Sequence, residues 1–451
     1  MQPMEIQEIA RAVGCRGNFS GMVEEISTDT RTLPQGCLFV ALKGERFNGH
    51  DYIVQAFEKG AAFALADERR DYGAAAGRVL YTADTKQGLM TIAAAYRKKF
   101  PIRCVGVTGS VGKTTTKDMI AQVVSAGYRT LKTKGNQNNE IGLPKTLFQL
   151  NPAYEAAVVE MGMEGLGEIA ALAAVAQPQI GVITNIGVSH IERLGSRENI
   201  LRAKMELADA LPDGAPLILC KDNDLLSKVT SDRLRILFYS VENRDADVWA
   251  EGGVEENGQT RFDICWADGN IHVQLPCAGV HNVQNALAAF LVGRQLGIPA
   301  ETCAQALAGY VPSGMRQKVV QRDGYTVVED CYNASPDSMY AALKTLENWQ
   351  GGSRRIAVLA DMLELGQISE QAHRDVGRFA AMHGVDLLLA YGPQARYYVE
   401  GANEVRAIGR HFTEKGTLCQ ALRQQVSPGC VVWVKGSRGM RLEEILEGLY
   451  R

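Results

Sequence analysis

The stretch from residue 104 to residue 124 constrains the fold more than any other part of the chain. It reads Cys-Val-Gly-Val-Thr-Gly-Ser-Val-Gly-Lys-Thr-Thr-Thr-Lys and continues with apolar residues at helical spacing. A buried strand, a glycine-rich loop and a helix in this order bind phosphates, because backbone N–H groups and the positive end of the helix face the anion. We therefore predict a nucleotide site in which Lys113 contacts the outer phosphates and the Thr114 hydroxyl ligates Mg2+.

The predicted phosphate loop is a short variant. The usual spacing places a glycine five residues before the glycine that precedes Lys113, and this position is Val107. A glycine-rich turn that binds nothing is the alternative. The position of the Gly-Lys-Thr-Thr sequence between a strand and a helix favours phosphate binding, because the mechanism requires that junction.

Length and composition limit the number of domains, the partners and the compartment that we expect for this chain. A chain of 451 residues suggests about three domains, and the formal net charge of −3 gives no reason to expect nucleic acid or an anionic membrane as partner. Ten scattered cysteines without a Cys-x-x-Cys pair indicate a reducing cytoplasm rather than disulfides or a zinc site. We expect neither a signal peptide nor a transmembrane helix, because no stretch has the required apolar length.

Residues 1–84 are predicted to form a small α/β domain. Two polar stretches, residues 27–31 and 43–51, are rich in turn formers and hydrogen-bond donors. The basic side chains in them are candidates to gather around an anionic ligand such as a diphosphate. These are Arg31, Lys43, Arg46 and His50. Two solvated loops that bind nothing are the open alternative.

Residues 85–313 are predicted to form the central domain, with a mainly parallel sheet. Apolar runs at residues 156–159 and 180–183 are typical of buried parallel strands, and Glu160 and His190 follow them. Ligands bind at the carboxyl ends of such strands, so both side chains are candidate metal ligands beside the phosphate loop. A single Glu or His would more often be structural, and their shared position favours the metal site.

Three further polar features of the central domain have no unique explanation. Asn136, Asn138 and Asn139 lie in a stretch that either binds a polar substrate or forms an amide-rich surface loop. Lys204 lies in a predicted amphipathic helix, where a lysine is ordinarily solvated. An alanine-rich helix begins near residue 279, and close packing explains its alanines but not the cluster of His281, Asn282 and Asn285 at its start.

A break in the pattern at residues 311–316 predicts a linker, and residues 314–451 read as a third, doubly wound domain of Rossmann-like α/β type. Its apolar runs, at residues 326–329, 356–359, 387–390 and 431–434, are each followed by a loop and a helix. Polar loops follow three of the predicted strands, at residues 330–338, 361–366 and 435–439. We expect ligand-binding side chains in these loops, because they lie at the carboxyl ends of the strands.

In the sequence and order of these motifs the chain resembles the Mur ligases, the ATP-dependent amide ligases of peptidoglycan synthesis. The family's loop has the same shortened spacing, and the order of motifs from Asn136 through Glu160, His190 and Lys204 to Arg316 also agrees. Within the family, residues 135–144, 361–366 and 435–441 look most like the members that act on D-alanyl-D-alanine. The resemblance covers nearly the whole chain.

The resemblance implies a reaction and a set of site residues. ATP would activate the terminal carboxylate of UDP-N-acetylmuramoyl-tripeptide as an acyl phosphate, and the amine of D-alanyl-D-alanine would attack it, in the cytoplasm and with a monomeric enzyme. The implied catalytic residues are Lys113, Lys204, His190 and Glu160, and the implied metal ligands are Thr114, Glu160, His190 and Lys204 as a carbamate. The implied ATP-binding residues are Thr108, Gly109, Ser110, Val111, Gly112, Lys113, Thr114, Thr115, Asn282, Asn285, Arg316 and Asp330. The implied substrate-binding residues are Ser27, Thr30, Arg31, Lys43, Arg46, Asn48, His50, Asn136, Asn138, Asn139, Asn333, Ser335, Lys435, Ser437 and Arg438.

Two positions depart from the family pattern, and two rival functions stay open. Ser335 replaces an asparagine and Ala360 replaces a glycine, which puts the dipeptide role of Ser335 in question. A related ligase such as a folylpolyglutamate synthase would share the ATP site but not the first domain. A non-catalytic nucleotide-binding module would retain the phosphate loop but would not need Glu160, His190 and Lys204 together.

Overall fold

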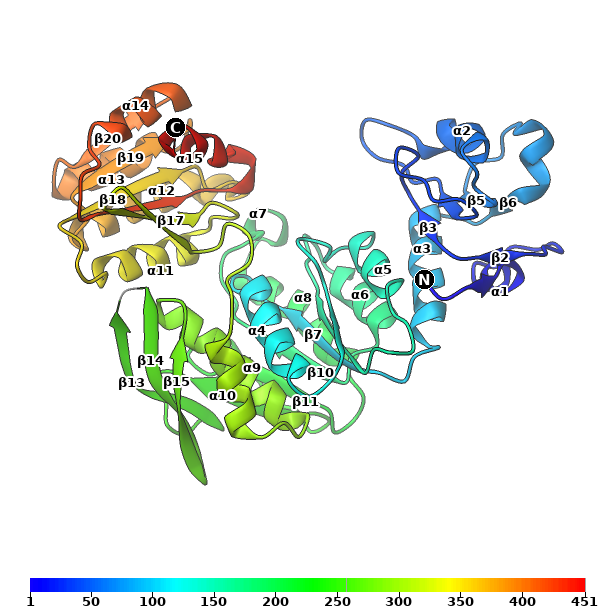
Figure 1. The fold of residues 1–451 in the computed structure, drawn as a ribbon, viewed down its shortest axis with the longest axis horizontal. Helices are drawn as coiled ribbons and strands as arrows, with labels where there is room; N and C mark the ends of the chain where they lie inside the picture. Colours follow the sequence, from blue (N-terminus) through cyan, green and yellow to red (C-terminus); the bar gives the residue numbers. More distant parts are fainter. Residues whose placement is uncertain (257, 451) are drawn as a thin grey trace.

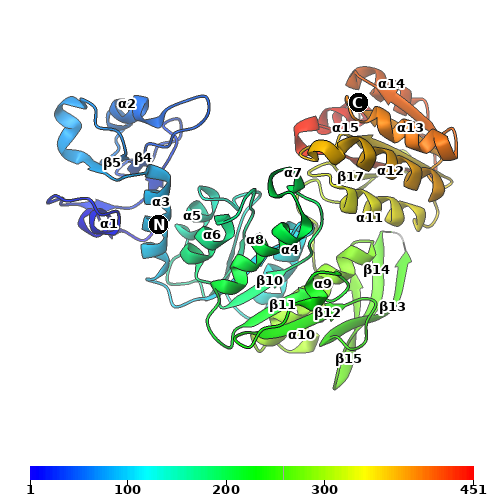
Figure 2. The ribbon, with the colours of Figure 1, turned by 180° about the vertical axis from the view of Figure 1, so that it is seen from behind.

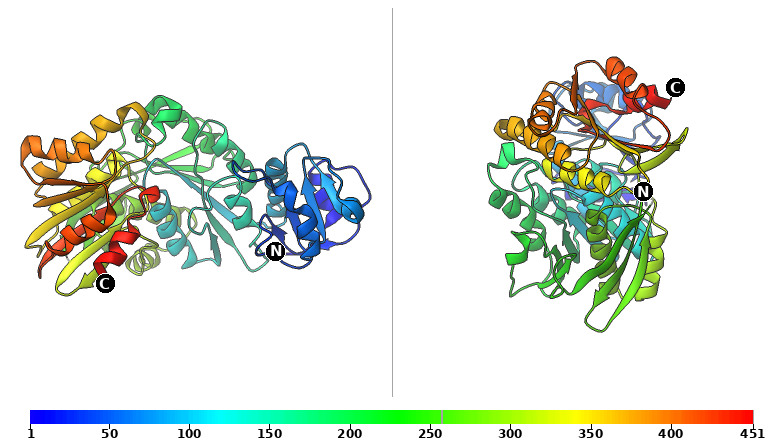
Figure 3. Two further views of the ribbon diagram at one scale, coloured as in Figure 1. Left: turned by 90° about the horizontal axis from the view of Figure 1, so that it is seen from above. Right: turned by 90° about the vertical axis from the view of Figure 1, so that its left-hand side faces the viewer.

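The structure is a computed structural model that describes residues 1–256 and 258–450. Its strands form three separate α/β lobes, which we call the first lobe (β1 to β6, residues 4–81), the middle lobe (β7 to β15, residues 103–275) and the third lobe (β16 to β21, residues 318–435). The first and third lobes lie at opposite ends of the middle lobe and stand apart from each other (Figures 1 and 3). None of the helices in the described residues is long and apolar enough to cross a membrane.

The first lobe contains a small parallel sheet of four strands in the order β3-β4-β5-β6, with β1 and β2 paired beside it. Its strands are β1 (Met4–Glu5), β2 (Met22–Val23), β3 (Ile26–Ser27), β4 (Leu38–Val40), β5 (Phe63–Ala66) and β6 (Val79–Tyr81). The helices are α1 (Ile6–Ala12) and α2 (Ile53–Glu58), and α3 (Thr85–Arg97) leads into the middle lobe. Strands β4 and β5 are buried along their whole length, so the core lies on both faces of this sheet.

The middle lobe is built on a nine-stranded sheet in the order β15-β14-β13-β12-β11-β10-β7-β9-β8. Neighbours from β8 to β13 run parallel, whereas β13, β14 and β15 form an antiparallel extension. The strands are β7 (Arg103–Thr108), β8 (Thr130–Lys132), β9 (Ala156–Glu160), β10 (Ile180–Ile183), β11 (Pro216–Cys220), β12 (Arg235–Ser240), β13 (Val248–Glu256), β14 (Gln259–Trp266) and β15 (Gly269–Leu275). The helices are α4 (Lys113–Ser125), α5 (Gly142–Leu147), α6 (Glu168–Ala176), α7 (Ile191–Leu194), α8 (Arg197–Asp209), α9 (Val280–Gln295) and α10 (Ala300–Ala308).

The third lobe has a six-stranded sheet in the order β16-β17-β21-β18-β19-β20, parallel except for the edge strand β16. The strands are β16 (Lys318–Arg322), β17 (Tyr325–Asp330), β18 (Arg354–Ala360), β19 (Leu387–Tyr391), β20 (Gly409–Phe412) and β21 (Cys430–Lys435). The helices α11 (Pro336–Glu347), α12 (Ser369–Met382), α13 (Arg396–Val405), α14 (Lys415–Arg423) and α15 (Glu443–Tyr450) surround the sheet (Figure 2). Two apolar cores, one on each face, identify it as doubly wound.

The predicted fold class is confirmed: all three lobes are α/β, and the middle and third lobes have mainly parallel sheets. The apolar runs named from the sequence are strands β9, β10, β17, β18, β19 and β21. Sequence reasoning did not identify β8, β11, β12, β16 and β20 in the middle and third lobes, or β1, β2, β5 and β6 in the first lobe. The domain boundaries after residues 84 and 313 stay predictions.

Strand register places the phosphate loop at one edge of the middle sheet. Strand β7 lies between β10 and β9, with Thr108 level with Ile183 and Val107 level with Glu160. Because the three strands are parallel, their carboxyl ends and the loops that follow them meet at this edge.

Helices α12 and α13 of the third lobe touch backbone to backbone, and glycine makes this contact possible. A Cβ atom at Gly401 would lie 1.9 Å from the carbonyl oxygen of Arg374, and one at Gly377 would lie 2.0 Å from the carbonyl oxygen of Tyr398. Both obstacles are backbone atoms, which move only if the helices separate.

We therefore expect Gly401→Ala to lower the free energy of unfolding by about 1–3 kcal/mol, the usual cost of overpacking. Urea unfolding of the full chain measures it. Gly416→Ala in α14 is the matched control, because, beyond its chain neighbours and the backbone of its own helix, no atom of the described residues lies within 4 Å of its Cβ position, and alanine favours a helix. Equal effects of the two substitutions would contradict this packing argument.

Candidate functional site

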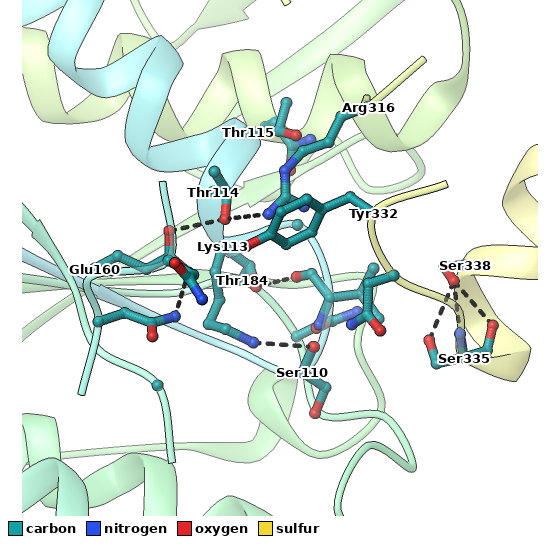
Figure 4. A pocket seen from close by; sticks show the side chains of 18 of the residues that line it. Ser110, Lys113, Thr114, Thr115, Glu160, Thr184, Arg316, Tyr332, Ser335 and Ser338 are labelled. Carbon is teal, nitrogen blue, oxygen red and sulfur yellow. Dashed lines mark hydrogen bonds between the residues drawn. The ribbon is translucent and has the colours of Figure 1, made fainter. Parts of the chain in front are cut away.

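A polar cavity of about 850 Å³ lies where the phosphate-loop edge of the middle lobe faces the third lobe. The middle lobe, the linker of residues 309–317 and the third lobe all contribute to its wall (Figure 4). The predicted site residues that line it are Ser110, Val111, Gly112, Lys113, Thr114, Thr115, Asn136, Asn138, Asn139, Glu160, His190, Asn282, Asn285, Arg316, Asp330, Asn333, Ser335 and Lys435. The structure thus brings together side chains that are up to 325 positions apart in the sequence.

The phosphate loop needs glycine at two positions. Gly109 has φ 151°, and a Cβ atom there would lie 1.9 Å from Oγ1 of Thr184. Gly112 has φ 82° and precedes the first residue of α4. The N-terminus of α4 has no side-chain cap among the described residues, so its N–H groups stay available to an anion in the cavity.

Lys113 folds back over the loop that carries it. Its Nζ donates hydrogen bonds to the carbonyl oxygens of Gly109 (2.8 Å) and Ser110 (3.2 Å). Burial lowers the pKa of the Lys113 ammonium, and Arg316 adds to this shift, whereas Glu160 opposes it. An anion beside Lys113 would relieve this unfavourable environment, which is what a phosphate site provides.

A chain of hydrogen bonds joins the linker, α4 and β9. The Thr114 hydroxyl donates to Oε2 of Glu160 at 2.8 Å and accepts from a guanidinium N–H of Arg316 at 2.9 Å. The side-chain amide of Asn138 donates to the other oxygen of Glu160, also at 2.8 Å. The Arg316 guanidinium stacks on Tyr332, 3.9 Å from the ring centre. Figure 4 shows Thr114 between Glu160 and Arg316.

His190 and Lys204 lie near Lys113 but differ in exposure. His190 lines the cavity with φ 65°, and its Nδ1 lies 3.2 Å from a carboxylate oxygen of Glu364 in the third lobe. Burial and the charges of Lys113 and Lys204 lower the pKa of His190 to about 4. Lys204 is buried in α8 and does not line the cavity, and burial together with Lys113 lowers its pKa well below the usual value.

The start of α9 presents an amide cluster to the cavity. Asn285 accepts a hydrogen bond from the Thr116 hydroxyl at 2.8 Å and donates to Oδ1 of Asn282 at 3.3 Å. The Asn282 amide donates to the side-chain oxygen of Gln317 at 2.7 Å, and Gln317 in turn contacts the His281 ring at 2.7 Å. The linker thus reaches the cluster that the sequence left unexplained.

In the third lobe, Asp330 and Lys435 form a buried ion pair at the carboxyl ends of the adjacent strands β17 and β21. Nζ of Lys435 lies 2.8 Å from Oδ2 of Asp330 and donates to the carbonyl oxygen of Asn333 at 3.1 Å. Ser335 caps helix α11 together with Ser338. The Ser335 hydroxyl donates to the Ser338 hydroxyl at 3.3 Å, so it has a local structural role in addition to its place in the cavity wall.

Several predicted site residues lie outside the cavity. Thr108 and Gly109 belong to the strand end and the loop but do not line the wall. The Ser437 hydroxyl accepts a hydrogen bond from the backbone of Leu363, and Arg438 pairs with Glu443 at 3.0 Å. Both residues therefore order loops of the third lobe in this arrangement.

None of the predicted residues of the first lobe reaches the cavity. Those residues are Ser27, Thr30, Arg31, Lys43, Arg46, Asn48 and His50. Arg31 pairs with Asp29, and Lys43 pairs with Asp67 and Glu68. The three groups His50, Asp67 and Glu68 have metal-like spacing, but the Lys43 ammonium lies 2.9 Å and 3.0 Å from the two carboxylates.

His50 requires a correction. Its ring is buried, with Nδ1 2.7 Å from Oδ1 of Asn48 and Nε2 accepting from the backbone N–H of Asp67 at 3.0 Å. The expectation that this ring faces an anionic ligand is therefore wrong for this arrangement, because both nitrogens are already used within the lobe. Burial also lowers the pKa of His50, which disfavours the cationic form.

Sequence reasoning did not select several residues of the cavity wall as site residues. Tyr332, Gln317 and Asp337 line it, as do Thr184 and Asn185. Asn185 accepts a hydrogen bond from the N–H of Val111 at 2.8 Å, and the Thr184 hydroxyl donates to the carbonyl oxygen of Val111 at 2.6 Å. Their position after β10, at the edge that carries the phosphate loop, was the available signal.

A phosphate loop at the edge of a parallel sheet, facing a second α/β lobe across a polar cavity, defines a nucleotide-binding protein whose site two lobes share. Family models agree with this class. The Mur ligase middle domain matches residues 107–293, the Mur ligase glutamate ligase domain matches residues 315–438, and the Mur ligase family catalytic domain matches residues 22–103. The chain belongs to the Mur ligase family.

Individual relatives match over nearly the whole chain. The UDP-N-acetylmuramoyl-tripeptide–D-alanyl-D-alanine ligase of Bacillus subtilis is 40% identical, covering 95% of this chain and 93% of its own length. A crystal structure of MurF from Acinetobacter baumannii has a TM-score of 0.93 at 30% identity, covering 100% of this chain and 99% of that chain. MurF from Thermotoga maritima in complex with ADP has a TM-score of 0.86 at 28% identity, covering 94% and 97%.

The Asp330–Lys435 pair leads to a prediction about stability. Asp330→Asn leaves a buried ammonium without its counter-charge, so we expect a loss of about 3–5 kcal/mol in the free energy of unfolding. Asp375→Asn is the control, because its pair with Arg378 is exposed, and we expect a loss of at most about 1 kcal/mol. Denaturant unfolding of both variants provides the comparison, and a loss for Asp330→Asn as small as that of the control would refute the prediction.

Proposed function

We propose that this protein is the ATP-dependent ligase that joins D-alanyl-D-alanine to UDP-N-acetylmuramoyl-tripeptide, giving the pentapeptide, ADP and phosphate. The observation that carries the proposal is the shared cavity, in which the phosphate loop faces Arg316 of the linker and Asp330 and Lys435 of the third lobe. The relatives that match over nearly their whole length bear the name of this ligase.

The polar groups of the cavity suggest how ATP binds. The phosphates would occupy the N-terminal end of α4, which has no side-chain cap among the described residues, and Lys113 would turn to them from the carbonyl oxygens of Gly109 and Ser110. Asn282 and Asn285 would contact the base, and Asp330 the ribose. Arg316 would turn from Thr114 towards the phosphates, since a guanidinium binds phosphate oxygens more strongly than a neutral hydroxyl.

The donors beside the phosphate loop fit Mg2+. Thr114 and Glu160 supply a hydroxyl and a carboxylate 2.8 Å apart, and oxygen donors of this kind are those that Mg2+ prefers. His190 and a carbamate on Lys204 would complete a second metal site. Bound Mg2+ would neutralise charge on the phosphates during transfer.

The reaction follows from the weak electrophilicity of a carboxylate. An oxygen of the tripeptide carboxylate attacks the terminal phosphorus of ATP, ADP leaves, and an acyl phosphate forms. The amine of the dipeptide then attacks the acyl carbon, the amide bond forms, and phosphate departs while the amine nitrogen loses its proton. Lys113 and Arg316 would stabilise negative charge on the transferred phosphoryl group, so catalysis would rest mainly on positioning and electrostatics.

The remaining assignments concern the residues that would bind the dipeptide and the nucleotide-linked tripeptide. Asn333, Ser335 and Lys435 would contact the dipeptide, with Ser437 and Arg438 joining them if the third lobe closes further. Asn136, Asn138 and Asn139 would contact the peptide of the nucleotide substrate. The UDP end would lie on the first lobe, at the residues already named there other than His50. The lobes would correspond to domains of residues 1–84, 85–313 and 314–451.

We also propose that the protein works as a monomer in the cytoplasm. All ten cysteines are free thiols, which suits a reducing compartment. Both substrates and ATP are small polar molecules.

Lys113 provides the direct test of the reaction. We expect Lys113→Ala to abolish ADP release that depends on both the tripeptide substrate and D-alanyl-D-alanine, because the phosphates lose their charged partner. Lys228→Ala, exposed and outside the cavity, should retain full activity. A phosphate-release assay with each substrate omitted in turn measures this. Activity in Lys113→Ala, or stimulation by folate and glutamate instead, would refute the assignment.

Lys204 offers a second test. A neutral amine reacts with CO2, and burial favours the neutral form of Lys204. We expect isotopically labelled bicarbonate to give a carbamate signal in carbon NMR that Lys204→Arg removes, together with an activity loss of roughly a hundredfold or more, the size typical of a lost charge-stabilising group. A wild-type enzyme without the signal at saturating bicarbonate would disprove the carbamate.

A further inference from the structure

A buried charged cluster lies one helical turn beyond the phosphate loop. Lys117 and Asp118 of α4 are only 2% and 4% exposed. Oδ1 of Asp118 lies 3.0 Å from Nζ of Lys117 and 2.8 Å from Nζ of Lys132. Neither Lys117 nor Asp118 lines the cavity, so binding of nucleotide does not explain why this charge is buried.

The second carboxylate oxygen of Asp118 contacts the linker. Oδ2 accepts a hydrogen bond of 2.6 Å from the hydroxyl of Ser313. Ser313 lies in the segment of residues 309–317, which has no helix or strand and joins α10 to β16 of the third lobe. The Asp118 carboxylate is therefore saturated by two ammonium groups and one hydroxyl.

The linker is attached to α4 at two points in register. Ser313 contacts Asp118, and Arg316, three residues later, contacts Thr114 at 2.9 Å. Thr114 and Asp118 are four residues apart, so they lie on one face of α4 about 6 Å apart along its axis. Three linker residues are long enough to span this distance.

The same cluster also reaches the strand that carries Glu160. Lys117 donates to the carbonyl oxygen of Thr133 at 2.8 Å, and the hydroxyl of Thr133 accepts from the N–H of Glu160 at 3.0 Å. The cluster on α4 is thus linked both to the end of β9 and to the linker.

From this geometry we propose that Asp118 is a positioning residue: through Ser313 it fixes the register in which the linker delivers Arg316 to the phosphate loop. The proposal rests on the proposed function in so far as Arg316 acts on ATP. Burial opposes ionisation of Asp118, but Lys117, Lys132 and Ser313 outweigh it and hold the pKa below the usual value, so the carboxylate is charged at neutral pH.

Ser313 is the better site for substitution, because Asp118→Asn would leave Lys117 buried without its charge and put folding at risk. Ser313 is exposed apart from its hydroxyl contact, so Ser313→Ala should keep the melting temperature. We expect kcat/KM for ATP to fall roughly tenfold or more, as for a lost hydrogen bond to a charged group. Ser313→Thr, which keeps the hydroxyl, should recover most of it.

A double-mutant cycle separates positioning from a general structural role. In an Arg316→Lys background, we expect Ser313→Ala to change kcat/KM by less than about twofold, because the group that it positions is already altered. Equal fold-losses in the wild-type and Arg316→Lys backgrounds would show that Ser313 acts independently of Arg316 and would overturn the proposal. So would an unchanged kcat/KM in Ser313→Ala.

Hydrogen–deuterium exchange without substrates tests the tether separately from the reaction. The amides of residues 309–317 should exchange faster in Ser313→Ala than in the wild type. Ser231→Ala is the control, since its hydroxyl accepts from the N–H groups of Arg233 and Leu234 just before β12 and makes no hydrogen bond to residues 309–317 among the described residues. Unchanged exchange in Ser313→Ala overturns the tether even if the ligase is active. Faster exchange in a protein without ligase activity supports the tether and refutes only the proposed reaction.

Discussion

The carboxyl ends of three parallel strands, β7, β9 and β10, meet at one edge of the middle sheet, and the rest of the site depends on this arrangement. Hydrogen bonding between parallel neighbours fixes their register, so Thr108, Glu160 and Ile183 end within about one residue of each other. Each following loop then projects into the same space. The third lobe needs only to face this edge in order to complete the cavity.

Much of this arrangement was predictable from the sequence, because its determinants are local. The phosphate loop and its helix follow from residues 104–124, and Glu160 and His190 follow from apolar runs that end at polar residues. Strands β8, β16 and β20 escaped prediction because they are short edge strands with few buried residues. Strand β11 is a short apolar run, and periodicity alone does not distinguish such a run from a buried helix.

The features of the site that could not be predicted depend on contacts between segments that are distant in the sequence. The bond between Asp118 and Ser313 joins residues 195 positions apart, and no spacing rule relates them. His50 shows the opposite failure: its polar surroundings suggested a ligand site, whereas the folded loop uses both ring nitrogens itself. A sequence shows which polar groups need partners but not whether the protein or a ligand supplies them.

The Thr114 hydroxyl has a consequence that extends beyond its place in the cavity. Its single O–H donates a hydrogen bond to Glu160, and its oxygen accepts a hydrogen bond from Arg316. A ligand that binds to this oxygen displaces the hydrogen bond from Arg316. A phosphate group of that ligand then gives the guanidinium a new and stronger acceptor. Nucleotide binding can therefore proceed as an exchange of partners in which no donor is left unsatisfied, and the resting contact keeps Arg316 beside the position that it would next occupy.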